Sequence, residues 1–243
     1  MIWIYLLSLF ILTLLGAFIP IFFKKFDQSW MTLLLAFSGA FLLSITLIHL
    51  LPEVFHELGE KAGVYILIGF GIQLLLQRLS HGVEHGHTHV HEGSSLNIFP
   101  IFIGLFIHAF MEGMPMGFVY QSPAAAPSIF LAIAAHKIPE AVTLSTILIG
   151  SHFANKKWKY ILLFALASPL AGMLAMYFGE KFDFISTQLV YIIPIVAGAF
   201  LHISTTILYE SGTKHHQLSK QKSIAIIFGI LLSFATLLFH AHE

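Results

Sequence analysis

Long apolar segments separated by short polar ones dominate this chain. Eight segments are long enough to cross a membrane as helices, which takes roughly 17–25 residues each. They cover residues 2–23, 30–51, 62–79, 97–120, 127–150, 159–179, 188–210 and 223–240. The third is the weakest, because Gln73 and Gln77 interrupt it. Since the connections are short, we expect one all-α transmembrane domain, residues 1–243, that crosses the lipid bilayer eight times.

The basic residues predict the orientation of these segments. If the first segment starts outside, the outer connections receive only Lys61 and Lys181, and Lys137 lies within a segment. The inner connections receive Lys24, Lys25, Arg78, Lys156, Lys157, Lys159, Lys214, Lys220 and Lys222. An excess of Lys and Arg is typical of cytoplasmic loops. We therefore expect both termini outside, in a plasma or inner membrane, with residues 2–23 retained as the first span.

A weak internal repeat suggests how the helices are arranged. The residues GAFL at 39–42 in the second segment recur at 198–201 in the seventh. These segments run in opposite directions, so the repeat would be inverted, an arrangement found in transporters around a midplane site. Chance identity is an equally good explanation in a chain rich in Leu and Phe. A true repeat would pair segments one to three with six to eight and leave four and five at the centre.

Those two central segments each carry a histidine and a carboxylate four residues apart. His108 precedes Glu112 in the fourth, and His136 precedes Glu140 in the fifth. On a helix this spacing puts both side chains on one face. Ionisable residues inside a membrane are costly and mark functional sites. Two imidazoles and two carboxylates at similar depth suit Zn²⁺, Fe²⁺, Mn²⁺ or Cd²⁺.

Composition narrows the chemistry. The chain is 57% hydrophobic and 10% charged, whereas soluble domains average about 25% charged residues. Its net charge of zero gives no reason to expect nucleic-acid binding. There is no cysteine, so a metal must be held by His, Asp or Glu. The two carboxylates would balance one dication, and metal would compete with protons for the site.

A histidine-rich loop, residues 80–96, lies on the predicted cytoplasmic side. Its candidate ligands are His81, His85, His87, His89 and His91. Flexible histidine tracts bind transition metals weakly, which predicts a loop that collects or senses metal. A solvated spacer would have the same composition. If the loop were the working part of a metal sensor, deleting residues 81–92 would abolish function, whereas a carrier would keep transport.

Three motifs resemble those of the ZIP family of divalent-metal transporters. They are HAFMEG at 108–113, HKIPE at 136–140 and HLLPE at 49–53. The resemblance implies a homodimer-prone bundle with a 3+2+3 helix arrangement, which imports metal into the cytoplasm by an elevator-like motion. Zn²⁺ would be the transported substrate, with Fe²⁺, Mn²⁺ or Cd²⁺ as alternatives and no organic cofactor. His108, Glu112, His136 and Glu140 match the family's primary transport site.

The resemblance also predicts that this site holds a single ion. Some family members bind a second ion through an Asn and two acidic residues, and this chain has Ala109, Lys137 and Ser168 at those positions. None of the three is a suitable ligand. Lys137 would instead place a fixed positive charge there, or pair with Glu140 when no metal is bound.

Other polar residues are candidates for the metal pathway. They are His49, Glu53, His202 and Glu210, each of which could equally serve in helix contacts or in a solvated segment. The main alternative function is a membrane-embedded zinc-dependent hydrolase, in which a permanently bound ion activates water at the same His/Glu site. The HExxH run that intramembrane zinc proteases carry is absent. We therefore expect a carrier and not an enzyme.

Overall fold

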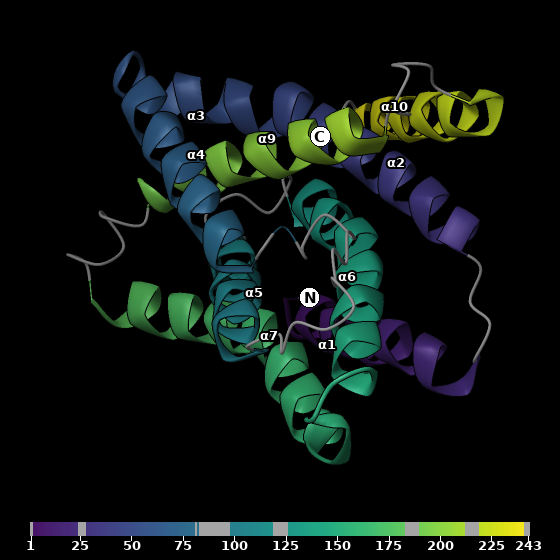
Figure 1. The fold of residues 1–243 in the computed structure, drawn as a ribbon. Helices are drawn as coiled ribbons and strands as arrows, with labels where there is room; N and C mark the ends of the chain where they lie inside the picture. Colours follow the sequence, from purple (N-terminus) through teal and green to yellow (C-terminus); the bar gives the residue numbers. More distant parts are fainter. Residues whose placement is uncertain are drawn as a thin grey trace.

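The computed structural model describes residues 2–23, 28–80, 82, 98–118, 126–182, 190–211 and 219–240, and in these it is all-helical (Figure 1). Within these residues, eight helical runs are long and apolar enough to cross a membrane. The predicted fold class, an all-α polytopic membrane protein, is confirmed. Helices suit the bilayer because they satisfy every backbone polar group internally.

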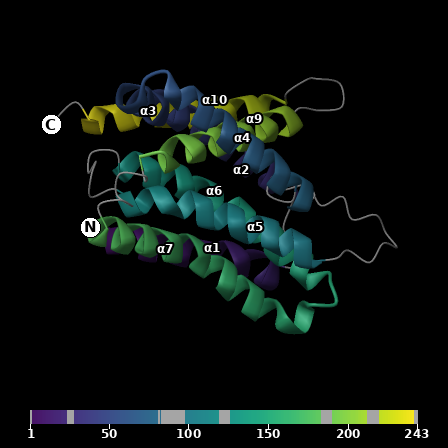
Figure 2. The same ribbon diagram turned by 90° about the vertical axis from the view of Figure 1, so that its left-hand side faces the viewer.

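The helices follow the predicted segments in order. In chain order they are α1 Ile2–Phe22, α2 Gln28–Ile45, η1 Thr46–Leu50, α3 Leu51–Leu58, α4 Lys61–Ser80, α5 Ile98–Gly113, η3 Met114–Phe118, α6 Ala126–Ile149, η5 Ala154–Lys156, α7 Lys157–Lys181, α9 Ile192–Ser211 and α10 Lys220–His240. As Figure 2 shows, α1 begins and α10 ends at the same end of the bundle. An even number of crossings gives this result.

The second crossing is longer than its apolar segment, since it runs over Ser29–Leu58. Polar residues of α3 such as Glu53 and Glu57 continue the helix beyond the apolar stretch. Between α2 and α3 the backbone forms a π-helical turn, in which the N–H of Leu51 donates to the carbonyl of Thr46, five residues back. Pro52 follows directly and has no N–H to donate. Hydropathy marks where apolar residues stop, and not where the helix ends.

The helices pack in two groups, which Figure 2 shows as two layers. In the first, α4 packs against α9 and α10 packs against α2. In the second, α1 packs against α6 and α5 packs against α7. The groups meet where α2 contacts α6 and where α4 contacts α5. The predicted 3+2+3 order and the inverted repeat stay predictions, but the two central helices α5 and α6 lie in the same group.

Glycines allow helices to cross closely in the first group. A Cβ on Gly198 of α9 would overlap the backbone of Ile66 in α4, and one on Gly69 of α4 would overlap the backbone of Ile195. On α2, a Cβ at Gly39 would lie 2.7 Å from Cγ2 of Ile207 in α9. Small residues are the usual means of close helix packing in membranes. Both copies of the GAFL sequence thus place their glycine at a helix crossing.

Candidate metal centre

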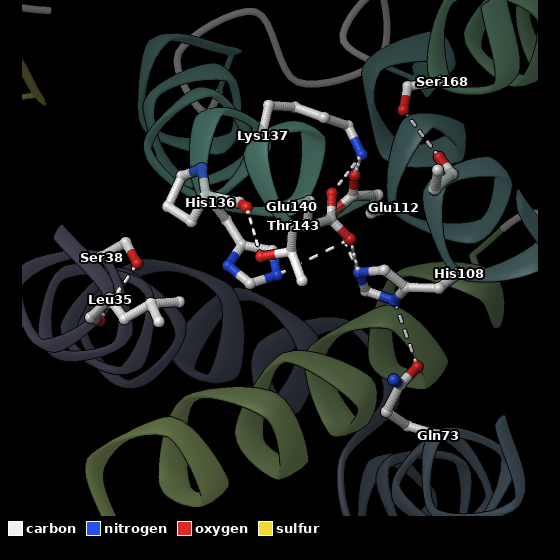
Figure 3. Close-up of polar contacts among 12 residues, drawn as sticks. Leu35, Ser38, Gln73, His108, Glu112, His136, Lys137, Glu140, Thr143 and Ser168 are labelled. Atoms are coloured by element: carbon white, nitrogen blue, oxygen red, sulfur yellow. Dashed lines mark hydrogen bonds and ion pairs between the residues drawn. The ribbon is translucent and has the colours of Figure 1, made fainter. Parts of the chain in front are cut away.

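Two adjacent helices carry the ionisable residues of the site. His108 and Glu112 lie on one face of α5, and His136 and Glu140 lie on one face of α6 (Figure 3). All four side chains are buried. The i, i+4 spacing brings each histidine beside the carboxylate of its own helix, as the sequence predicts.

Three of these side chains converge on one point. The ligand atoms of His108, His136 and Glu140 all lie within 4.8 Å of one another. Oε1 of Glu140 is 2.9 Å from Nε2 of His108 and 3.8 Å from Nε2 of His136. Ligands around a tetrahedral Zn²⁺, with bonds of about 2.0–2.1 Å, are separated by roughly 3.3 Å. Small side-chain adjustments would therefore let all three bind one ion.

The surroundings of His136 fit a metal ligand. Its ring is fully buried, and in the described part of the chain neither ring nitrogen has a hydrogen-bond partner. Burying a polar group without a partner is costly, so such a ring is a ready ligand. Two imidazole nitrogens and a carboxylate oxygen form a donor set that suits Zn²⁺ and neighbouring divalent ions.

Lys137 lies directly beside this group. It is 1% exposed, and its Nζ is 2.8 Å from Oε2 of Glu140 and also forms an ion pair with Glu112. The ring centroid of Phe164, on α7, is 5.2 Å from the same nitrogen. Lysine is almost never fully buried unless it is paired. The ammonium therefore lies where α5, α6 and α7 meet, between two carboxylates.

Glu112 contacts both Lys137 and His108. Its carboxylate is paired with Lys137, and its Oε2 lies 3.5 Å from Nε2 of His108. Glu112 thus borders the group of His108, His136 and Glu140, and its part in a metal site stays a prediction. The charge balance also differs from the expected one, which set two carboxylates against one dication. With the ammonium and neutral imidazoles the site carries −1 without metal and +1 with a bound dication.

The positions that the resemblance assigns to a second ion hold Ala109, Lys137 and Ser168, and Ser168 joins two helices. The hydroxyl of Ser168 donates to the carbonyl oxygen of Ala109 at 2.7 Å, which joins α7 to α5. A Cβ at Gly113 would overlap the backbone of Ser168, so the two helices approach closely at this point. The side chain of Ala109 offers no donor atom, and Lys137 supplies a positive charge in place of an acid.

One residue of the site was missed by the sequence reasoning. Gln73 of α4, interpreted as a weakness of the third span, is fully buried, and its Oε1 lies 3.2 Å from Nδ1 of His108 (Figure 3). The signal was available, because an amide within an apolar span is as unexpected as a charge and needs a partner. Its partner could not be identified from the sequence, because His108 lies on a different helix.

The candidate pathway residues lie outside the ligand group. Nε2 of His49 is 2.7 Å from Oγ1 of Thr236, which links η1 to α10. His202 is buried with its ring edge against Phe70, at a centroid distance of 4.8 Å. Glu53 lies in the first turn of α3, and Glu210 is half-buried near the end of α9. The five histidines of the loop, His81, His85, His87, His89 and His91, lie outside the described residues.

Comparison with known proteins gives a consistent picture. A family model described as "ZIP Zinc transporter" matches residues 1–98 and 83–239. Zinc transporter ZupT of Akkermansia muciniphila is 31% identical over an alignment 248 residues long, and the alignment covers 90% of this chain and 89% of that protein. Zinc transporter ZIP9-B of Xenopus laevis is 27% identical over an alignment of 207 residues that covers 74% of this chain. Zinc transporter ZIP9 of Micropogonias undulatus is 28% identical over an alignment of 214 residues that covers 76% of this chain. The chain spans about two thirds, 66%, of the length of each of these two vertebrate proteins.

Proposed function

The chain belongs to the ZIP zinc transporter family, and we propose on that premise that it carries Zn²⁺ into the cytoplasm through a site on α5 and α6. The observation that carries the proposal is the convergence of His108, His136 and Glu140 inside the membrane-spanning bundle. Fe²⁺, Mn²⁺ and Cd²⁺ are further candidate substrates, because selectivity among such ions depends on geometry and availability. ZIP proteins are transporters and not enzymes, so the hydrolase alternative loses its support.

We propose that transport proceeds by a sliding motion between the two helix groups. All three converging ligands lie in the group of α1, α5, α6 and α7, which meets the other group mainly along α2–α6 and α4–α5. A rigid-body shift of the second group, which holds α1, α5, α6 and α7, would carry the whole site across the bilayer. This motion requires no change in the ligand set, because the ligand-bearing helices move together. A single domain, residues 1–243, and a homodimer are part of this proposal.

The excess of basic residues supports the proposed orientation. The connections assigned to the cytoplasm are flanked by Arg78 at the end of α4, Lys156 and Lys157 at the junction of η5 and α7, and Lys220 and Lys222 at the start of α10. Both termini are then outside. Metal that enters from the outer face and leaves at the inner one would be imported, in a plasma or inner membrane.

Uptake by proteoliposomes tests the carrier function. Purified protein in sealed vesicles should accumulate Zn²⁺ faster than protein-free vesicles, with Fe²⁺, Mn²⁺ and Cd²⁺ measured in parallel to rank the substrates. Saturation with rising metal concentration is expected, since a carrier has a finite number of sites. Uptake no faster than in protein-free vesicles for all four ions would refute the proposal.

We propose further that the site binds one ion per chain. Lys137 lies beside both carboxylates, Ser168 is engaged with the backbone of α5, and Ala109 has no ligand atom. A second dication placed here would meet the ammonium at close range. A zinc-soaked crystal structure with anomalous scattering data should show one ion between α5 and α6, and two ions there would contradict the proposal.

A further inference from the structure

We propose that Gln73 is a positioning residue that orients the imidazole of His108 for metal binding. The inference rests on the proposed function and assigns a role to a residue outside the predicted site. Gln73 belongs to α4, in the helix group opposite the ligands, and reaches α5 through a buried hydrogen bond between Nδ1 of His108 and its own Oε1, 3.2 Å apart. Figure 3 shows His108 held between Gln73 on one side and Glu140 on the other.

The chemistry of this contact determines which ring nitrogen of His108 carries the proton. An amide oxygen can only accept a hydrogen bond, so Nδ1 of His108 must carry the proton. The lone pair of a neutral ring is then on Nε2, which faces Oε1 of Glu140 at 2.9 Å. Both of these atoms are acceptors, so they repel each other unless a cation binds to both. Histidines that bind metals almost always donate their other N–H to such an acceptor, which sets both tautomer and orientation.

Burial indicates that the contact is the reason for a glutamine at this position. Gln73 is fully buried, and its amide nitrogen Nε2 has no hydrogen-bond partner among the described residues. An apolar side chain would avoid the cost of burying the amide, about 1–3 kcal/mol on mutational scales. Packing alone therefore gives no reason for an amide here, whereas the bond to His108 does.

Close helix packing joins α4 and α5 near this bond. One turn before His108, a Cβ at Gly104 of α5 would lie 3.2 Å from both Cβ and N of Ser80 on α4. The two helices thus touch near the site with almost no space for a side chain between them. This close approach keeps α4 next to α5 on the side of the site that holds Gln73.

The bond has a consequence for transport, because it joins the two helix groups. If α5 slides along α4, His108 moves away from Gln73 while keeping Glu140, which lies in its own group. The imidazole is then oriented in one arrangement of the carrier and free to turn in the other. A carrier benefits when its affinity for metal differs between the two arrangements, because metal must bind on one side of the membrane and leave on the other.

Three variants separate positioning from packing. Gln73→Met keeps the side-chain volume but removes the acceptor. Gln73→Glu keeps an acceptor oxygen within reach of Nδ1. Gln77→Met is the matched control, since Gln77 is half-buried one turn further along α4. Each purified protein is assayed for its Zn²⁺ dissociation constant by chelator competition, for the absorption spectrum of bound Co²⁺, for thermal unfolding and for uptake kinetics.

Positioning predicts a specific set of results. Gln73→Met should raise the Zn²⁺ dissociation constant and the KM of uptake by about 10- to 100-fold, as is usual when a partner of a metal ligand is lost. It should also alter the Co²⁺ spectrum, with thermal unfolding unchanged. Gln73→Glu should return the dissociation constant towards the wild-type value, and Gln77→Met should leave every readout unchanged.

Two outcomes would overturn the inference. Wild-type affinity in Gln73→Met would show that the acceptor is unnecessary, and equal losses in the Met and Glu variants together with lower thermal stability would show a packing role. The binding measurements need no transport. A protein whose Zn²⁺ affinity depends on Gln73 but which moves no metal would therefore refute the carrier proposal and leave the positioning role standing.

Discussion

Replacing Glu140 by glutamine is expected to reduce Zn²⁺ uptake by more than about 100-fold, beyond the range seen when only a partner of a metal ligand is lost. Oε1 of Glu140 faces both His108 and His136, and Oε2 is bonded to Lys137. An amide has nearly the same shape but is neutral and has one oxygen instead of two. The variant therefore loses one of the two oxygens of the shared ligand and its negative charge, while the volume of the side chain stays nearly the same.

The measurement is initial uptake by proteoliposomes together with Zn²⁺ binding in detergent. Removing one partner of a buried ion pair costs about 3–5 kcal/mol in other proteins, so thermal unfolding must be followed to show that the variant is folded. Glu57→Gln is the matched control, because Glu57 is an exposed residue of α3 that undergoes the same chemical change. Undiminished uptake by a folded Glu140→Gln protein would refute the assignment of the site.

Replacing Lys137 by methionine is expected to tighten Zn²⁺ binding by at least about tenfold, or 1.4 kcal/mol, and to lower the maximal uptake rate. The ammonium neutralises one of the two negative charges that Glu112 and Glu140 offer to a cation. At about 4 Å, two unit charges interact by roughly 4 kcal/mol at an effective dielectric constant of 20. Without the ammonium the dication is held more strongly, and its release to the cytoplasm becomes slower.

In this variant Zn²⁺ binding should therefore become tighter while transport becomes slower. The Zn²⁺ dissociation constant and KM are expected to fall, and the maximal rate is expected to fall with them. Lys159→Met, at an exposed lysine of α7, controls for the loss of a positive charge elsewhere. Weaker Zn²⁺ binding in Lys137→Met would instead mean that the ammonium supports the loaded site, contrary to its position between the carboxylates.

The membrane crossings could be predicted from the sequence because the bilayer restricts the secondary structure that an apolar segment can adopt. An apolar run of about 20 residues in lipid must be helical, so hydropathy alone predicted eight helices in the right order. The limits of the helices are less determined, since Glu53 and Glu57 extend the second crossing without changing its direction. Polar residues near the membrane surface can be helical or irregular at similar cost.

The candidate ligands could also be picked out from local spacing. A histidine and a carboxylate four residues apart share a helix face whatever the rest of the fold does, and the expense of burying them in lipid marked them as functional candidates. The expected pairing of Lys137 with Glu140 is present for the same reason, because the two residues are one turn apart on α6.

Contacts between helices were decided by the tertiary structure alone. The ion pair of Lys137 with Glu112 joins α6 to α5, and the bond from Gln73 to His108 joins α4 to α5. Helix periodicity determines which side chains share a face, but not which face of another helix lies opposite or at what height. Those choices depend on backbone approach at small residues such as Gly113 and on packing over the whole bundle. The sequence by itself therefore determined the helices and the candidate metal ligands. The fold decided that the ammonium of Lys137 reaches Glu112 as well as Glu140, and that Gln73 lies beside His108.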